Sequence, residues 1–148
     1  MTEKQLLQAL ATDELDYPAL AGKITASDTA HLQKIAKGND VGLATKAVYL
    51  ASLSGDSNAH DVVAEASRSK RELVRIAAAS GVVNLPEARQ NQVAQHLLDD
   101  TDPSVVKLTI KAVARPDQAV RQKLQKLGTS SPHDFIKKLS QDKLSRTP

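Results

Sequence analysis

Hydrophobic residues recur every three to four positions along almost the whole chain, which is the period of an amphipathic α-helix. Alternation of apolar and polar residues, the pattern of a half-buried β-strand, is not sustained in any segment. Alanine and leucine dominate the apolar positions, and β-branched residues form only short clusters. The pattern therefore predicts an all-α protein with about ten short helices and no strands.

Residues that begin and end helices divide this pattern into short segments. Asp40 and Asp102 are typical N-caps, Ser69–Glu72 fits a capping box, and Gly128 is suited to stop a helix. Gly38 is expected to end a helix in the left-handed conformation. The expected helices cover residues 3–11, 18–24, 28–37, 41–53, 57–67, 70–82, 86–98, 103–114, 116–127 and 132–144.

The segments also resemble one another at a regular spacing. Residues 40–44 align with 70–74 at a spacing of 30, and 70–74 align with 102–106 at a spacing of 32. The apolar positions that coincide are Leu43, Leu73 and Val105, and one turn later Val48, Ala78 and Ile110. A helix–turn–helix unit that recurs about every 30 residues is the signature of an α-solenoid, in which each helix pair buries its apolar face against its neighbours.

The segment Asp99–Leu108 (DDTDPSVVKL), followed by Ile110 and Ala112-Val113, resembles the core of a HEAT repeat. In that family an Asp and a Pro lead into the second helix of each unit, and a Val-Arg or Val-Lys pair follows. The resemblance covers roughly residues 27–144, and the period of about 30 is similar to the short HEAT-like repeats of bacterial proteins.

The resemblance implies a right-handed superhelix, with the first helix of each pair outside and the second helices lining the concave side. It also implies binding of a partner more often than catalysis, although some relatives are bilin lyases or DNA glycosylases. The connections are too short to link separate domains, so we expect one domain over residues 1–148. Within it, residues 1–26 form a helical cap, 27–144 form the repeats, and 145–148 form a frayed tail.

The charge of the chain is unevenly distributed. Residues 1–103 carry 10 basic and 14 acidic side chains, whereas residues 104–148 carry 10 basic and 3 acidic side chains, a net charge of +7. This asymmetry indicates either a basic surface for an anionic partner or a well-solvated, lysine-rich end. No apolar run has transmembrane length and no signal-peptide pattern begins the chain, so we expect a cytoplasmic protein.

Candidate chemistry is sparse. The four histidines, His31, His60, His96 and His133, form no i, i+4 pair, and there is no cysteine, so we expect no metal site. Most serines next to helices are accounted for by capping, and no glycine-rich nucleotide-binding motif occurs. We therefore expect no cofactor and no enzymatic activity. The apolar first helices leave homo-oligomerisation open.

Two classes of partner are compatible with the basic C-terminal third. Sequence-independent binding to a nucleic-acid backbone needs lysines and arginines near phosphates. Readers of unpaired bases also need aromatic side chains, and the chain has only Tyr17, Tyr49 and Phe135. The absence of tryptophan argues against a base-flipping glycosylase. A protein–protein scaffold is therefore the favoured function, and nucleic-acid binding is the alternative.

The repeat register predicts where a protein partner would bind. Thr45, Arg75 and Lys107 are equivalent, Lys137 extends the series at a spacing of 30, and Tyr49, Ala79 and Lys111 follow one turn later. Because these positions lie opposite the apolar stripes, they are expected to face solvent along the concave side. The predicted site is a ladder that holds an acidic segment of a partner, with an aromatic anchor at its N-terminal end. Its residues are Tyr49, Arg75, Lys107, Lys111 and Lys137.

Overall fold

The computed structural model describes all residues 1–148 and contains ten α-helices, two short 3-10 helices and no strand. The predicted all-α class and the expected number of helices are confirmed. In chain order the elements are α1 (Glu3–Leu10), α2 (Tyr17–Ala21), η1 (Ala26–Asp28), α3 (Thr29–Ala36), α4 (Val41–Leu53), α5 (Ser57–Ala66), α6 (Glu72–Gly81), η2 (Val82–Asn84), α7 (Glu87–Leu97), α8 (Pro103–Ala112), α9 (Gln118–Ser130) and α10 (Asp134–Arg146). No helix is both long enough and apolar enough to cross a membrane.

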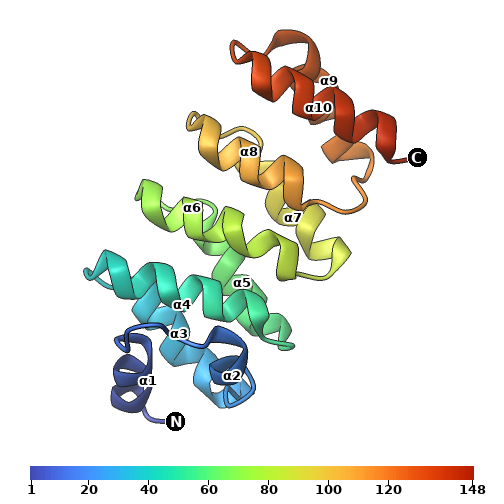
Figure 1. The fold of residues 1–148 in the computed structure, drawn as a ribbon. Helices are drawn as coiled ribbons and strands as arrows, with labels where there is room; N and C mark the ends of the chain where they lie inside the picture. The colour runs from blue at the N-terminus through green and yellow to red at the C-terminus, as the bar shows by residue number, and fades with distance from the viewer.

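The helices form two layers, each built from every second helix of the chain. α4, α6, α8 and α10 contact one another in sequence, and α3, α5, α7 and α9 do the same behind them (Figure 1). The short helices α1 and α2 pack against α3 and α4 at the N-terminal end. We call the exposed side of α4, α6, α8 and α10 the even-helix face.

Each helix pair adds to one continuous core of 33 buried hydrophobic residues. The core is rich in alanine where α4 and α6 lie, and Ala47, Ala51 and Ala78 are among its fully covered members. Small side chains let helix backbones approach closely, so contact between helices replaces bulky side-chain packing. The core therefore grows by stacking rather than by enclosing a central cluster.

Gly81 marks the closest approach between α4 and α6. A Cβ atom added at Gly81 would lie 2.7 Å from Cβ of Ser52. The hydroxyl of Ser52 donates to the carbonyl oxygen of Tyr49 at 2.5 Å and accepts a hydrogen bond from Nδ2 of Asn84 at 3.1 Å. Because both hydrogen bonds hold Ser52 in place, no atom at this contact can move away easily.

Aspartates cap five helices, among them α2, where Asp16 Oδ1 accepts from the backbone N–H of Ala19 at 3.1 Å. Asp40 Oδ1 accepts from the backbone N–H of Leu43 at 3.0 Å, and Asp102 Oδ1 accepts from that of Ser104 at 2.9 Å, as predicted. Asp56 and Asp117 cap α5 and α9 in the same way. Each carboxylate satisfies an otherwise unpaired N–H and lies at the positive end of a helix dipole.

The capping box predicted at Ser69–Glu72 is wrong. The helix begins at Glu72 with Arg71 as its N-cap, and the Ser69 hydroxyl accepts instead from the backbone N–H of Arg71 at 3.1 Å. This local turn places the helix start at Glu72, two residues later than a serine cap at Ser69 would. The side chain of Glu72 is then available to contact Asp102 at the start of the next even helix.

Of the two glycines predicted to end helices, Gly38 does follow the C-cap residue of α3, Lys37, but not in the predicted conformation. No glycine has a positive φ, so Gly38 is not left-handed, and its N–H bonds to the carbonyl oxygen of Ile35 at 3.0 Å. Gly128 does not stop α9, which continues to Ser130. An added Cβ at Gly128 would lie 3.2 Å from Cγ of Gln141, so the glycine allows α9 and α10 to pack closely.

The last helix also extends further than expected. α10 continues to Arg146 rather than ending near residue 144. Thr147 is held by Arg121, whose Nη1 donates to the threonine carbonyl oxygen at 2.9 Å. α10 therefore ends two residues later than expected, and Thr147 after it has a hydrogen-bond partner; the fraying of residues 145–148 stays a prediction.

We expect Gly81→Ala to destabilise the protein by about 1–3 kcal/mol, because the new methyl group overpacks the contact with Ser52. The clash outweighs the higher helix propensity of alanine, which is worth about 1 kcal/mol. Thermal or urea unfolding measures the difference. Gly55→Ala is the matched control, since an added Cβ there meets nothing within 4 Å. Equal stability of the two variants would contradict the close approach of α4 and α6.

Candidate functional site

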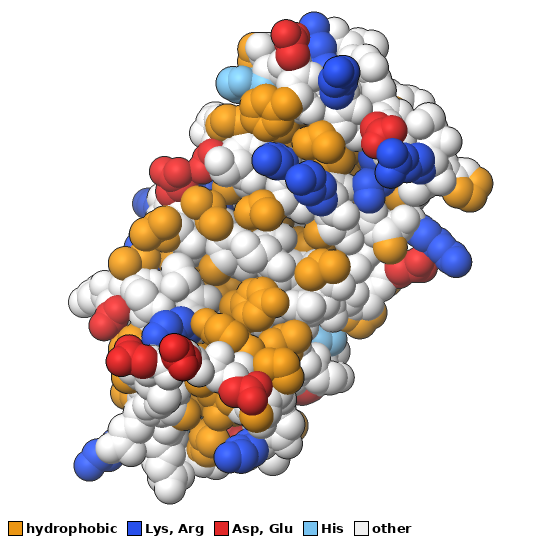
Figure 2. All heavy atoms as spheres, in the orientation of Figure 1, with side chains coloured by type: hydrophobic (Ala, Val, Ile, Leu, Met, Phe, Trp, Pro, Cys, Tyr) orange, Lys and Arg blue, Asp and Glu red, His pale blue; other side chains and the backbone are white.

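Apolar side chains lie exposed on the even-helix face. Leu73 of α6 is 55% exposed and Phe135 of α10 is 44% exposed. Ile76 of α6, Leu108 of α8 and Leu139 of α10 are half-buried, and Figure 2 shows hydrophobic atoms across this face. Exposed or half-buried apolar side chains on α6, α8 and α10 together are typical of a surface that contacts another protein.

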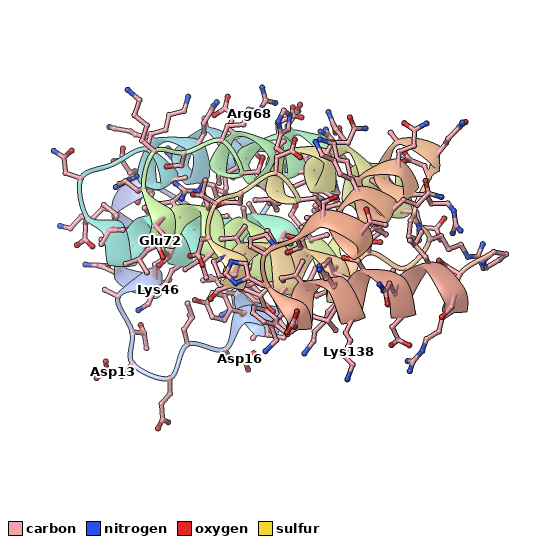
Figure 3. The ribbon with its side chains drawn as sticks, turned by 90° about the horizontal axis from the view of Figure 1, so that it is seen from above. Asp13, Asp16, Lys46, Arg68, Glu72 and Lys138 are labelled. Atoms are coloured by element: carbon pink, nitrogen blue, oxygen red, sulfur yellow. The ribbon has the colours of Figure 1, made fainter.

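Basic side chains gather on the same face toward the C-terminal end. Figure 2 shows Lys and Arg side chains over α8 and α10, and Figure 3 shows Lys138 pointing away from α10, on the side opposite Arg68. Of the ten basic residues after position 103, only Arg115, Lys123 and Arg146 form ion pairs. The other seven are Lys107, Lys111, Arg121, Lys126, Lys137, Lys138 and Lys143. Positive charge is therefore in excess at this end of the molecule.

The chain itself covers the N-terminal end of the face. The loop that carries Asp13 and Asp16 runs along this side (Figure 3), and Lys46 Nζ donates to the carbonyl oxygen of Leu10 at 2.9 Å. Tyr17 then meets Tyr49 edge to face, with ring centroids 4.9 Å apart. Burial raises the pKa of Tyr17, and the neighbouring Tyr49 adds to this effect. Tyr49 is consequently packed against α2 and is less available to a partner than predicted.

Arg75 is also engaged within the chain. Its Nε lies 2.7 Å from Oδ2 of Asp100, and the two side chains are only 20% and 5% exposed. Its Nη1 donates to the carbonyl oxygens of Ser69 and Lys70 at 3.0 and 3.2 Å. These contacts join the turn before α6 to the turn before α8. Arg75 thus has a structural role, which limits what it can offer to a partner carboxylate.

A pair of carboxyl groups lies beside this ion pair. A hydrogen bond with Asp102, together with the negative charge of that residue, raises the pKa of Glu72. The same hydrogen bond lowers the pKa of Asp102, and the backbone N–H of Ser104 contributes. At neutral pH the two carboxylates repel each other across the contact between α6 and α8.

The remaining predicted residues lie on α8 and α10. Lys107 and Lys111 are exposed and lie four residues apart on α8, so they share one side of the helix. Lys137 is half-buried, whereas Lys138 is exposed beside Leu139. The half-buried pair Leu108 and Leu139 indicates a spacing of 31 for the last unit, rather than the 30 used in the prediction.

The predicted faces of α6 need two further corrections. Leu73, expected in the buried stripe, is exposed, and Ala79, expected in solvent, is 1% exposed. Phe135 and Lys138 were not predicted as site residues. A helical period applied to α10 by itself would have found them, since Phe135, Lys138 and Leu139 are spaced by three and four residues.

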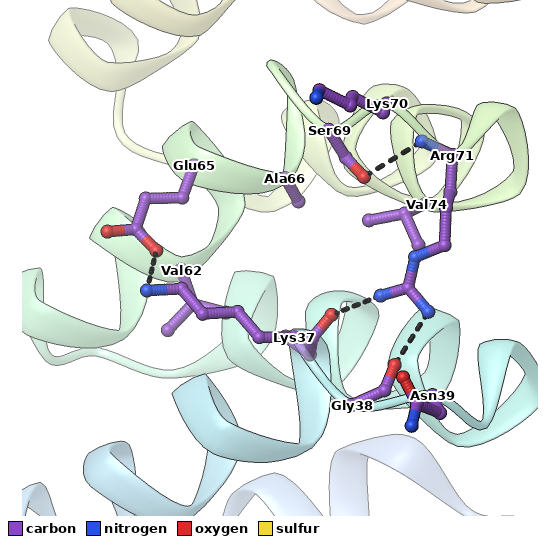
Figure 4. Close-up of a pocket in the computed structure, with 11 residues that line it drawn as sticks. Lys37, Gly38, Asn39, Val62, Glu65, Ala66, Ser69, Lys70, Arg71 and Val74 are labelled. Carbon is purple, nitrogen blue, oxygen red and sulfur yellow. Dashed lines mark hydrogen bonds and ion pairs between the residues drawn. The ribbon is translucent and has the colours of Figure 1, made fainter.

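The largest pocket lies at the edge of the stack, between the turn that joins α3 to α4 and the turn that joins α5 to α6. It holds about 400 Å³, and small residues such as Gly38 and Ala66 line it. Figure 4 shows Arg71 reaching across to the carbonyl oxygens of Gly38 and Ala36, at 2.6 and 2.9 Å. On its other side Lys37 pairs with Glu65 at 3.2 Å. Most of its charged groups are thus used to tie adjacent helix pairs together.

Groups that could carry out chemistry are dispersed. Nowhere do three or more His, Asp or Glu side chains lie close enough together to hold a metal ion. His60 is buried, with its Nε2 2.6 Å from the carbonyl oxygen of Ser54, so its position is explained by packing. The most developed surface features are therefore the exposed apolar side chains and the unpaired lysines of the even-helix face.

Comparison with known proteins adds no family to this description. No protein-family model matches the chain. Among curated proteins, none is significantly similar to it.

We expect Asp100→Asn to destabilise the protein by about 1–3 kcal/mol, because it leaves the half-buried guanidinium of Arg75 without its counter-charge. In a double-mutant cycle, Arg75→Gln and Asp100→Asn together should cost less than the sum of the single changes. Urea unfolding of the four proteins measures this coupling. Lys34→Gln, which removes the exposed pair with Glu3, is the control and should change stability by less than about 1 kcal/mol. Additive effects at positions 75 and 100 would contradict the structural role of Arg75.

Glu72→Gln should give a small rise in melting temperature at pH 7 and no change at pH 3. The raised pKa of Glu72 means that the folded protein favours its protonated form, so ionisation costs stability as the pH rises through that pKa. Glutamine keeps a hydrogen-bond donor for Asp102 and removes the repulsion. Because the site is exposed, added salt should reduce the difference. A lower melting temperature for Glu72→Gln at pH 7 would contradict this contact.

Proposed function

We propose that this chain is a HEAT-like α-solenoid that acts as a non-catalytic protein-binding module. Its partner would carry an acidic segment and would bind along the even-helix face, which is the concave side in a solenoid of this kind. The repeat spacing of 30 to 32 residues and the contact of each even helix with the next support the solenoid assignment. For the function, these features support an elongated binding surface that is built from equivalent helices.

One observation carries the proposal, namely that exposed apolar and unpaired basic side chains occur together on one face. Leu73 and Phe135 are exposed there, and Lys107 and Lys111 have no carboxylate within 4.0 Å. Apolar contacts supply most of the affinity of a protein interface, and complementary charge at its rim speeds association and selects the partner. An acidic segment with apolar side chains has the chemistry that fits both groups.

Nucleic-acid binding is the second candidate, favoured by the seven basic residues after position 103 that form no ion pair, five of which lie on α8 and α10. Phosphate contacts would give a steep dependence of affinity on salt. The chain offers little for base stacking, because Tyr17 and Tyr49 contact each other and only Phe135 is exposed. Exposed aliphatic side chains such as Leu73 would also find no partner on a phosphate backbone. The protein-binding proposal accounts for more of the face.

The charge-reversed variant Lys107→Glu/Lys111→Glu should lose most of the proteins captured by the intact chain in a pull-down, at least tenfold by quantitative mass spectrometry. Arg75 is left unchanged in this test because its ion pair supports the fold. Lys4→Glu/Lys23→Glu is the matched control, since both lysines are exposed at the N-terminal end.

Nuclease treatment separates the two candidate functions. Partners that persist after treatment and are lost only with the α8 variant support a protein-binding face. Loss of every partner after treatment would favour nucleic-acid binding. Equal capture by the two charge-reversed variants, in proteins that melt normally, would remove the even-helix face as the binding site.

A further inference from the structure

A groove runs between α8 and α10 at the basic end of the even-helix face. It holds about 280 Å³, and its apolar part is formed by Ile110 and Leu139. Its charged lining consists of Lys111, Asp142, Lys143 and Arg146. Three cations therefore share the groove with one carboxylate.

The charges of the groove are only partly compensated inside the protein. Lys143 Nζ donates to the carbonyl oxygen of Val113 at 2.7 Å, beyond the C-terminal end of α8. Arg146 pairs with Asp142 at 3.2 Å through one nitrogen, and Lys111 has no acidic partner. Partial burial lowers the pKa of Lys143, and the positive charge of Arg146 lowers it further. Two like charges held close together in a partly dry groove favour the arrival of an anion.

A stripe of two apolar and two charged residues runs along α10 beside the groove. Phe135, Leu139, Asp142 and Arg146 follow one another at positions i, i+4, i+7 and i+11, so they lie along one side of the helix. At 1.5 Å per residue the stripe is about 16 Å long, which equals about three helical turns. It begins with the exposed ring of Phe135 and ends with the exposed guanidinium of Arg146.

We propose that the α8–α10 groove binds one amphipathic acidic helix of a partner protein. The Asp or Glu side chains of this helix would pair with Lys111 and Arg146, and its apolar side chains would cover Phe135 and Leu139. Two helices can pack side by side with interdigitating side chains spaced at three and four residues, which matches the stripe on α10. The inference rests on the proposed protein-binding function and adds to it the form, charge and position of the bound segment.

A phosphate backbone fits these observations less well. It could neutralise Lys111 and Arg146, but it would leave the rings and methyl groups of Phe135 and Leu139 without contacts. A segment that carries carboxylates and aliphatic side chains could pair with the cations and also cover the apolar residues of the stripe. We therefore assign the groove to a protein segment.

The test is an NMR titration of the full-length, ¹⁵N-labelled protein with three probes. The first is a blocked 14-residue helical peptide that has leucine at every third or fourth position and glutamate between them. The second is a scrambled peptide of the same composition, and the third is the oligonucleotide (dT)12. We expect saturable amide shifts in α8 and α10 with the first peptide, and at least about tenfold weaker binding of the scrambled peptide and of (dT)12.

Variants locate the site on the groove. Lys111→Glu should lower the affinity for the first peptide by about tenfold, and Phe135→Ala should lower it by about fivefold. Lys4→Glu and Val83→Ala are the matched charged and apolar controls outside the groove, and both should bind as the unaltered protein does. All four positions are exposed, so we expect each variant to fold like the unaltered protein.

The absence of saturable shifts, equal binding of the scrambled peptide, or tighter binding of (dT)12 to α8 and α10 would overturn the inference. Shifts confined to α4 and α6 would overturn it as well, while the protein-binding function would stand. Failure of the protein-binding function itself would instead appear as loss of every captured partner after nuclease treatment.

Discussion

The close stacking of the even helices is the constraint on which the rest of the structure depends. No helix pair of this length can bury its own apolar face, so each pair is stable only against its neighbours. Gly81 of α6 sits so close to Ser52 of α4 that no side chain larger than hydrogen fits there. Alanines fill the core around this contact. The exposed sides of the stacked helices lie next to one another and together form the even-helix face.

Small residues pack the helices together in the core. At the edges of the stack, long polar side chains join each helix pair to the next. Arg71 bonds to carbonyl oxygens in the turn before α4, and Arg75 pairs with Asp100 in the turn before α8. On the other edge, Asn91 of α7 accepts from the N–H of Asp117 at 2.8 Å and donates to the carbonyl oxygen of Arg115 at 3.0 Å. These contacts set the relative positions of the pairs, and they use side chains that by sequence alone resemble binding residues.

The chain covers one end of the even-helix face and leaves the other end open, so the two ends differ in charge. At the N-terminal end, α2 and the acidic loop before it occupy the side of α4, and Tyr17 covers Tyr49. At the C-terminal end, no further helix covers α8 and α10, and five lysines of these two helices form no ion pair: Lys107, Lys111, Lys137, Lys138 and Lys143. The chain therefore places its own acidic segment on one end of the face and exposes the basic end. This is the physical basis for expecting an acidic partner there.

The sequence by itself determined the helical class, the number of helices and the caps at Asp40 and Asp102, because these depend on periodicity and on local hydrogen bonds. Lys107 and Lys111 were likewise found exposed, since their helix phase follows from neighbouring residues. Only the tertiary structure decided the roles of Arg75, Tyr49 and Gly128, whose partners lie on other helices. It also decided that Leu73 and Phe135 are exposed. Burial depends on which helix stacks against which side, and a single repeat does not contain that information.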